Sequence, residues 1–224
     1  MVTAADGATR LIELNQPEKL NCLSLAMLAG VRTALEGNTA GRIVLTGGGR
    51  AFCTGLDLDE VAATNGGRDH LRQLVAIYRW LLETDADTVA FARGYAVGGG
   101  AGLLSCARRA IVAGDFRYRL PGGKLSSLAA VVPPLCEFRA GGKRPDGSGW
   151  LGCDLDADEA RRLGLVDQVV SEGDLGDLIG AAREGRLPPG FRKPVVRDAV
   201  ATATALAELD RFLERLEAQR LDGR

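Results

Sequence analysis

Two glycine-rich segments, each placed directly after a short apolar run, limit most strongly what this chain can fold into. The first, residues 49–57 (GRAFCTGLD), follows the apolar run 42–46, and the second, residues 94–100 (GYAVGGG), follows the run 88–92. Apolar runs of this length predict buried strands, and a helix-like stretch follows each segment. A backbone that turns from strand to helix through glycine leaves N–H groups without an internal partner. Two such N–H groups facing one point would form an oxyanion hole, which stabilises negative charge on a carbonyl oxygen.

The wider pattern predicts an α/β fold with much parallel sheet, because strand-like and helix-like stretches alternate along the chain. Strands are predicted at 9–14, 42–46, 88–92, 110–113, 117–120 and 165–170, and helices at 24–36, 70–84, 98–107 and 156–163. Residues 121–149 are rich in Gly, Ser and Pro and are interpreted largely as loop. Apolar residues recur at helical spacing from 194 to 221, which predicts a long amphipathic helix or two. We therefore expect a core domain at 1–190 and a C-terminal helical segment at 191–224.

Composition excludes several classes of function. The 28 basic and 29 acidic residues give a net charge of −1, so nothing indicates a nucleic-acid partner. No apolar run reaches the ~20 residues of a membrane span. The N-terminus lacks the pattern of a signal peptide, and we expect a cytoplasmic protein. Neither glycine segment matches a nucleotide-binding motif.

Cysteine and histidine usage argues against a disulfide framework and a metal centre. The five cysteines are odd in number and contain no CxxC pair, so we expect buried free thiols. A single histidine, His70, excludes a metal site built on several histidines. His70 stands in the polar stretch Arg68–Gln73, and we expect it to face solvent from a helix.

Four motifs in order resemble the enoyl-CoA hydratase/isomerase (crotonase) superfamily. Residues 14–24 (LNQPEKLNCLS) are similar to its LNRPEKRNALS opening, 43–57 to VVLTGxGRAFCAGxD, 94–100 to GYAxGGG and 158–170 to AxxAxxxGLVxxVV. The resemblance spans most of the chain and implies the crotonase ββα spiral with a C-terminal helical region. It also implies a homotrimer or hexamer that binds acyl thioesters of coenzyme A or phosphopantetheine, with no metal and no further cofactor.

By position, the resemblance makes the backbone N–H groups of Leu56 and Gly99 the two oxyanion donors. Gly99 begins a helix, where the helix dipole adds positive potential. The Leu56 side chain is then free to line the acyl pocket. The same segments contain the expected substrate-binding residues Phe52, Gly55, Gly98 and Gly100.

The departures from the family pattern concern the acid/base residues. Where hydratases have two Glu residues, this chain has Gly102 and Gly122, or Ser126 or Ser127 when the second is aligned back from Pro133. Water addition to an enoyl thioester needs a positioned acid/base, so we expect no useful hydration of crotonyl-CoA. The nearest carboxylates in sequence are Asp57, Asp59 and Glu60. Asp57 is the catalytic candidate, and its simpler role is N-cap of the next helix.

Several functions stay open at this point. The wording of the motifs most resembles the dehydratase-type crotonases of polyketide β-branching cassettes, which dehydrate a 3-hydroxy-3-methylglutaryl group on an acyl carrier protein. The alternatives are a non-catalytic accessory subunit, and a thioester decarboxylase or isomerase that uses only the oxyanion hole. Five arginines around the first loop favour an acidic carrier protein over free coenzyme A, although solvated helix positions explain them equally well: Arg42, Arg50, Arg68, Arg72 and Arg79.

Overall fold

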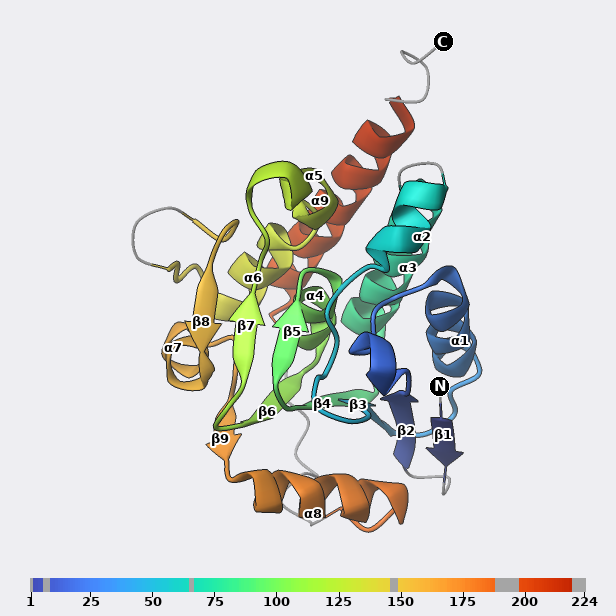
Figure 1. Cartoon of the computed structure of the whole chain (residues 1–224), viewed down its shortest axis with the longest axis vertical. Coiled ribbons are helices and arrows are strands. Elements are labelled where there is room, and N and C mark those ends of the chain that lie inside the picture. Colours follow the sequence, from blue (N-terminus) through green and yellow to red (C-terminus); the bar gives the residue numbers. More distant parts are fainter. Residues whose placement is uncertain (1, 6–8, 65–66, 146–148, 188–197, 219–224) are drawn as a thin grey trace.

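The protein is an α/β structure with two sheets, which confirms the predicted fold class (Figure 1). The computed structural model describes residues 2–5, 9–64, 67–145, 149–187 and 198–218. The large sheet has the order β1 (Val2–Ala5), β2 (Thr9–Leu14), β3 (Arg42–Gly47), β4 (Asp87–Ala92), β6 (Arg109–Ala113) and β9 (Gln168–Val170). All neighbours in it are parallel except β1 and β2. The small sheet contains β5 (Tyr95–Val97), β7 (Arg117–Arg119) and β8 (Asp154–Asp156).

The large sheet is covered on both faces, which explains why nearly every residue of its central strands β3 and β4 is buried. On one side Ile43 and Leu45 of β3 join the main core with helices α1 (Leu25–Glu36), α3 (Arg68–Glu83) and α4 (Gly99–Cys106). On the other side Val44 packs in a second cluster with buried residues of helix α8 (Glu172–Arg183), which runs beneath the sheet in Figure 1. Parallel strands buried on both faces lose the alternation of a half-exposed strand.

Helix α8 was not predicted from the sequence, whereas helix α7 (Ala157–Leu163) was. Asp156 and Glu159 form a capping box at the start of α7, and Gly164 ends the helix in a left-handed conformation. The predicted strand 165–170 is confirmed only in its last three residues, as β9.

The interpretation of residues 121–149 as loop is wrong for much of that stretch. It contains a 3₁₀ turn (Gly123–Leu125), α5 (Ser126–Ala129) and α6 (Pro133–Ala140). The two prolines that suggested loop stand in the first turn of α6, where a missing N–H costs nothing, and Gly141 ends the helix at φ 60°.

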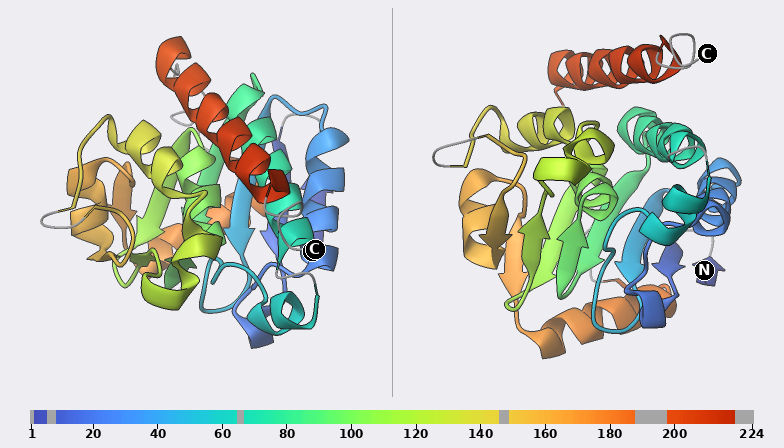
Figure 2. Two further views of the ribbon diagram at one scale, coloured as in Figure 1. Left: turned by 90° about the horizontal axis from the view of Figure 1, so that it is seen from above. Right: turned by 45° about the horizontal axis from the view of Figure 1, so that its top comes forward.

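The predicted C-terminal helix is present as α9 (Ala199–Ala218), which lies across the top of the molecule in Figure 2. It buries Leu209, Phe212 and Leu216 and packs against α3 and α6. Val200 is 77% exposed. The predicted ends at 194 and 221, like the domain boundary between 190 and 191, fall outside the described residues.

Candidate active site

The two glycine segments lie side by side and pair like short parallel strands. Phe52 N–H donates to Arg93 O at 3.0 Å, and Val97 N–H donates to Cys53 O at 2.9 Å. Gly55 has φ +88°, and a Cβ added there would lie 2.8 Å from Val97 O and 3.3 Å from Gly99 N. Only glycine allows so close an approach at this conformation. The structure thus brings the predicted donor segments together.

Backbone pairing directs the Leu56 N–H away from the neighbouring chain. Leu23 N–H donates to Gly55 O at 2.7 Å, and Asp57 N–H donates to Leu23 O at 3.2 Å. Because successive peptide groups of an extended chain point to opposite sides, the N–H of Leu56 points away from Leu23. Gly99 is the first residue of α4, where the N–H has no partner within the helix. Among the described residues, neither N–H group donates a hydrogen bond.

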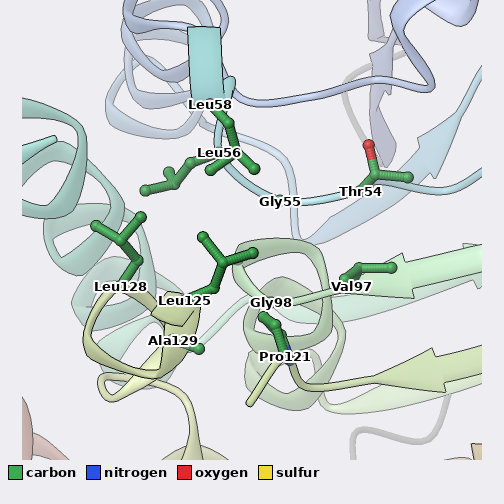
Figure 3. A pocket seen from close by; sticks show the side chains of 11 residues that line it. Thr54, Gly55, Leu56, Leu58, Val97, Gly98, Pro121, Leu125, Leu128 and Ala129 are labelled. Carbon is green, nitrogen blue, oxygen red and sulfur yellow. The ribbon is translucent and has the colours of Figure 1, made fainter. Parts of the chain in front are cut away.

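Both donor residues line one pocket of about 140 Å³, shown in Figure 3. Leucine side chains from the segment around α2 (Leu58–Ala63) and from α5 extend into it from different sides. The residues that line it are Thr54, Gly55, Leu56, Leu58, Val97, Gly98, Gly99, Pro121, Leu125, Leu128 and Ala129. Thr54 has the one polar side chain of this lining, and its hydroxyl donates to Leu20 O at 3.2 Å. Two residues whose N–H groups donate no hydrogen bond within the described chain thus belong to an otherwise apolar lining.

Two of the predicted substrate-binding residues have other positions. Gly55 and Gly98 line the pocket, whereas Phe52 and Gly100 are not part of its lining. Phe52 is fully buried in the main core. A Cβ at Gly100 would lie 2.2 Å from Cys53 O, so this glycine allows α4 to pack on the first glycine segment. Both residues shape the site through packing, and their assignment as substrate-binding residues stays a prediction.

Tyr78 occupies the space next to Gly102, where family hydratases have a Glu. A Cβ at Gly102 would lie 2.2 Å from the Tyr78 hydroxyl oxygen, so the structure has no room for a side chain there. The Tyr78 hydroxyl donates to Gly99 O at 2.8 Å, and burial raises its pKa well above the ordinary value, so the phenol stays neutral. Sequence reasoning missed Tyr78, although its place on the apolar face of the predicted helix 70–84 indicated burial.

The second hydratase position is also without a carboxylate. Gly122 is exposed and follows Pro121, which lines the pocket. Ser126 and Ser127 lie on α5, and the pocket wall there is built by Leu125 and Leu128.

Asp57 is the N-cap of α2, the simpler of its two predicted roles. Its carboxylate accepts from Glu60 N–H at 3.2 Å, lies 2.8 Å from Lys19 Nζ and 3.4 Å from Cys22 Sγ. The hydrogen bond from Lys19 lowers the pKa of Asp57. Burial, together with the neighbouring Asp57, raises the pKa of the Cys22 thiol to about 11. Asp57 does not line the pocket, and its catalytic role stays a prediction.

His70 is completely buried, so the prediction that it faces solvent is wrong. Its Nε2 lies 3.0 Å from Glu60 Oε2. The polar neighbours of His70 in sequence were misleading, since His70 stands four residues before Leu74 and eight before Tyr78, on the apolar face of α3.

Most of the predicted arginine cluster is occupied by contacts within the chain. Arg42 pairs with Asp87, Arg72 with Asp69 and Glu217, and Arg79 with Glu83 and Asp210. The pairs Arg72–Glu217 and Arg79–Asp210 join α3 to α9.

The structure also bears on the predictions about disulfides, metal sites and membrane spans. Cys53, Cys106 and Cys136 are buried and Cys22 and Cys153 partly so, all as free thiols. Within the described residues no group of three or more His, Cys, Asp or Glu side chains gathers as a metal site. None of the described helices has the length and apolar character that crossing a membrane requires.

Comparison with known proteins shows the family of this chain. A family model described as enoyl-CoA hydratase/isomerase matches residues 5–184. The probable enoyl-CoA hydratase echA8 of Mycobacterium tuberculosis is 31% identical over 175 residues, which are 76% of this chain and 68% of the relative. The 1,2-epoxyphenylacetyl-CoA isomerase of Escherichia coli is 30% identical and covers 95% of this chain and 86% of its own length.

Solved structures show the same fold. The enoyl-CoA hydratase EchA3 of Mycobacterium ulcerans superposes with a TM-score of 0.76 at 20% identity and covers 97% of each chain. An enoyl-CoA hydratase subunit of Geobacillus kaustophilus has a TM-score of 0.67 at 27% identity, over 99% of this chain and 90% of its own. The chain therefore belongs to the enoyl-CoA hydratase/isomerase family, the crotonase superfamily.

Proposed function

We propose that this protein is a lyase that acts on acyl thioesters and holds the thioester oxygen between the N–H groups of Leu56 and Gly99. The observation that supports this is the pair of unpaired N–H groups on one apolar pocket. N–H groups that are fixed before the reaction stabilise an enolate, because they need no reorganisation as negative charge develops. The names of the relatives, enoyl-CoA hydratase and 1,2-epoxyphenylacetyl-CoA isomerase, support a coenzyme A thioester or its phosphopantetheine equivalent.

The first candidate reaction is dehydration of a 3-hydroxyacyl thioester in secondary metabolism, for which the resemblance to β-branching dehydratases is the support. The Cα–H bond breaks and leaves an enolate, and the Cβ–O bond then breaks to release water and form the enoyl thioester. A base must take the α-proton and an acid must protonate the hydroxyl. No carboxylate, imidazole or thiol lines the described pocket, so this reaction requires groups from the substrate or from beyond that lining.

The second candidate, decarboxylation of a 2-carboxyacyl thioester, is favoured by the chemistry of the pocket wall. The bond from Cα to the carboxyl carbon breaks, its electron pair forms the enolate, and carbon dioxide leaves without a base. A proton from solvent water then adds to Cα and gives the acyl thioester, since the lining contains no acid. The lining supplies no cation to stabilise the carboxylate, and an apolar wall raises its energy relative to the enolate held by the N–H groups. For the same reason a terminal carboxylate, as on a 3-hydroxy-3-methylglutaryl group, finds no partner in this lining.

Mass spectrometry of thioester panels tests the proposal. The purified protein is incubated with 3-hydroxyacyl and 2-carboxyacyl thioesters, each on coenzyme A and on an acyl carrier protein. Loss of water or of carbon dioxide identifies the reaction. The carrier whose thioester is turned over faster is the preferred one. Binding of these thioesters with no turnover of any of them would indicate an accessory subunit instead.

A further inference from the structure

One carboxylate oxygen connects three helices next to the candidate site. Glu60 on α2 accepts, through Oε2, from the N–H of Leu25 at 2.9 Å, and the same oxygen lies 3.0 Å from Nε2 of His70. Leu25 is the first residue of α1, and His70 lies in the first turn of α3. His70 is completely buried, whereas the side chain of Glu60 is 33% exposed.

The contacts define the protonation of the pair. The hydrogen bonds from His70 and from Leu25 lower the pKa of Glu60, so its carboxylate is ionised near neutral pH. An ionised carboxylate only accepts hydrogen bonds, and Nε2 of His70 must therefore carry a proton and donate it to Glu60. The other ring nitrogen, Nδ1, is buried and has no hydrogen-bond partner among the described residues.

The pair is linked to the Leu56 donor through a short stretch of backbone. The peptide groups on both sides of Leu56 are hydrogen-bonded to Leu23, as described above. Two residues later, Leu25 is held by Glu60. Glu60 itself stands one turn after Leu56, at the third position of α2. The segment that carries the first N–H donor is thus closed into a loop by the Glu60 carboxylate.

The pair is linked to the second donor through α3. A Cβ at Gly99 would lie 3.1 Å from the side chain of Leu74, which stands one helical turn after His70. A Cβ at Gly67, three residues before His70, would lie 3.5 Å from Leu128, which lines the pocket. Residues three and four apart share one face of a helix, so His70 stands between two contacts to the pocket.

We propose that Glu60 and His70 are positioning residues that hold the Leu56 and Gly99 N–H groups at the spacing a thioester oxygen requires. This role rests on the proposed function and adds residues that do not touch the substrate. Ser24 already caps α1 by accepting from Met27 N–H, so a helix cap does not by itself require the second contact from Glu60. Displacement of a donor by a fraction of an ångström weakens carbonyl polarisation much more than it weakens binding of the acyl group.

The test compares Glu60→Ala with Glu60→Gln, His70→Phe and the double variant Glu60→Ala/His70→Phe. We expect Glu60→Ala and His70→Phe each to lower kcat by about tenfold or more, with a much smaller change in KM. Glu60→Gln keeps an acceptor oxygen and should recover part of kcat. The double variant should lose no more than the worse single variant, since the two residues act as one unit. Glu83→Ala, which removes an exposed ion pair at the other end of α3, is the matched control and should keep the kcat of the parent protein.

A second measurement reads the donors without substrate and separates this proposal from the proposed function. Amide resonances and hydrogen-exchange rates of Leu56 and Gly99 are compared between Glu60→Ala and the parent protein by NMR. We expect both amides to shift and to exchange faster, while Glu83→Ala leaves them unchanged. Unchanged amides in folded Glu60→Ala, equal loss in kcat and 1/KM, or fully additive effects in the double variant would each overturn the proposal. Absence of any turnover in the parent protein would count against the proposed function alone.

Discussion

The N–H of Gly99 can be removed without breaking the helix that it begins. Gly99 is the first residue of α4, a position where proline fits a helix because no intrahelical bond is lost. Gly99→Pro should therefore lower kcat/KM by an amount equivalent to ~2.7–4 kcal/mol, the usual cost of one oxyanion donor. Steady-state kinetics on the thioester identified above measures it.

Gly99→Ala is the matched control, because it adds the same first carbon and keeps the N–H. That carbon would lie 3.1 Å from the side-chain ends of Leu23 and Leu74, and small rotations of these side chains relieve the close contact. Equal losses for Gly99→Pro and Gly99→Ala would show that crowding, and not the hydrogen-bond donor, matters at this position.

Gly102 is fixed by the position of Tyr78, so a substitution there should destabilise the fold. Gly102→Ala forces its methyl group to within 2.2 Å of a fully buried phenol, and overpacking of this kind costs about 1–3 kcal/mol. Chemical denaturation measures the loss, and shortening Tyr78 in a Gly102→Ala/Tyr78→Leu double variant should recover part of it. Gly176→Ala on α8 is the control, since nothing lies within 4 Å of the added carbon and alanine favours the helix.

At the scale of elements, the start of α2 depends on an ionised Asp57. Contacts with Lys19 and with the Glu60 N–H lower the folded-state pKa of Asp57 below its ordinary value of 3.8. A group whose pKa is lowered by folding stabilises the fold above its unfolded pKa, and this contribution is lost as the pH falls through the folded pKa. We expect the melting temperature to fall as the pH drops below the ordinary pKa of 3.8 toward the lower folded-state pKa, and Asp57→Asn to flatten this part of the profile. A profile of Asp57→Asn that is parallel to that of the parent protein would contradict this.

Elements with a local signal were predictable, and elements defined by long-range packing were not. The strands β3 and β4 and the glycine turns after them follow from apolar runs and from glycine, which act over a few residues. Helix α6 was missed because Pro133 and Pro134 are ambiguous between a loop and a first helical turn. The pocket wall was missed as well, because Leu125 and Leu128 reach it only through the placement of α5. The Glu60–His70 contact joins two helices, and no spacing in the sequence predicts it.

The docking of α9 also belongs to this scale and can be measured separately. Phe212 is buried against the body, and Phe212→Ala should cost about 3–5 kcal/mol of unfolding free energy. Val200, on the same helix, is 77% exposed, and Val200→Ala should change stability by less than about 0.5 kcal/mol. Similar values for the two variants in urea titrations would show that α9 does not pack on the body in solution.

At the scale of the whole molecule, the family resemblance predicts a homotrimer or hexamer, and the surface of the single chain is consistent with further contacts. Large apolar side chains remain exposed at Leu58, Tyr95, Leu125, Leu151 and Val200. Leu58 and Leu125 line the candidate site, and a neighbouring subunit or a bound acyl group would remove them from water. We expect sedimentation at micromolar concentration to give a mass that is three or six times the 23.6 kDa of one chain. Surface labelling of Leu58 and Leu125 separates the two explanations. If the preferred thioester protects these residues and a higher protein concentration does not, they belong to the substrate site alone. A single species of 23.6 kDa across the concentration range would contradict the expected assembly.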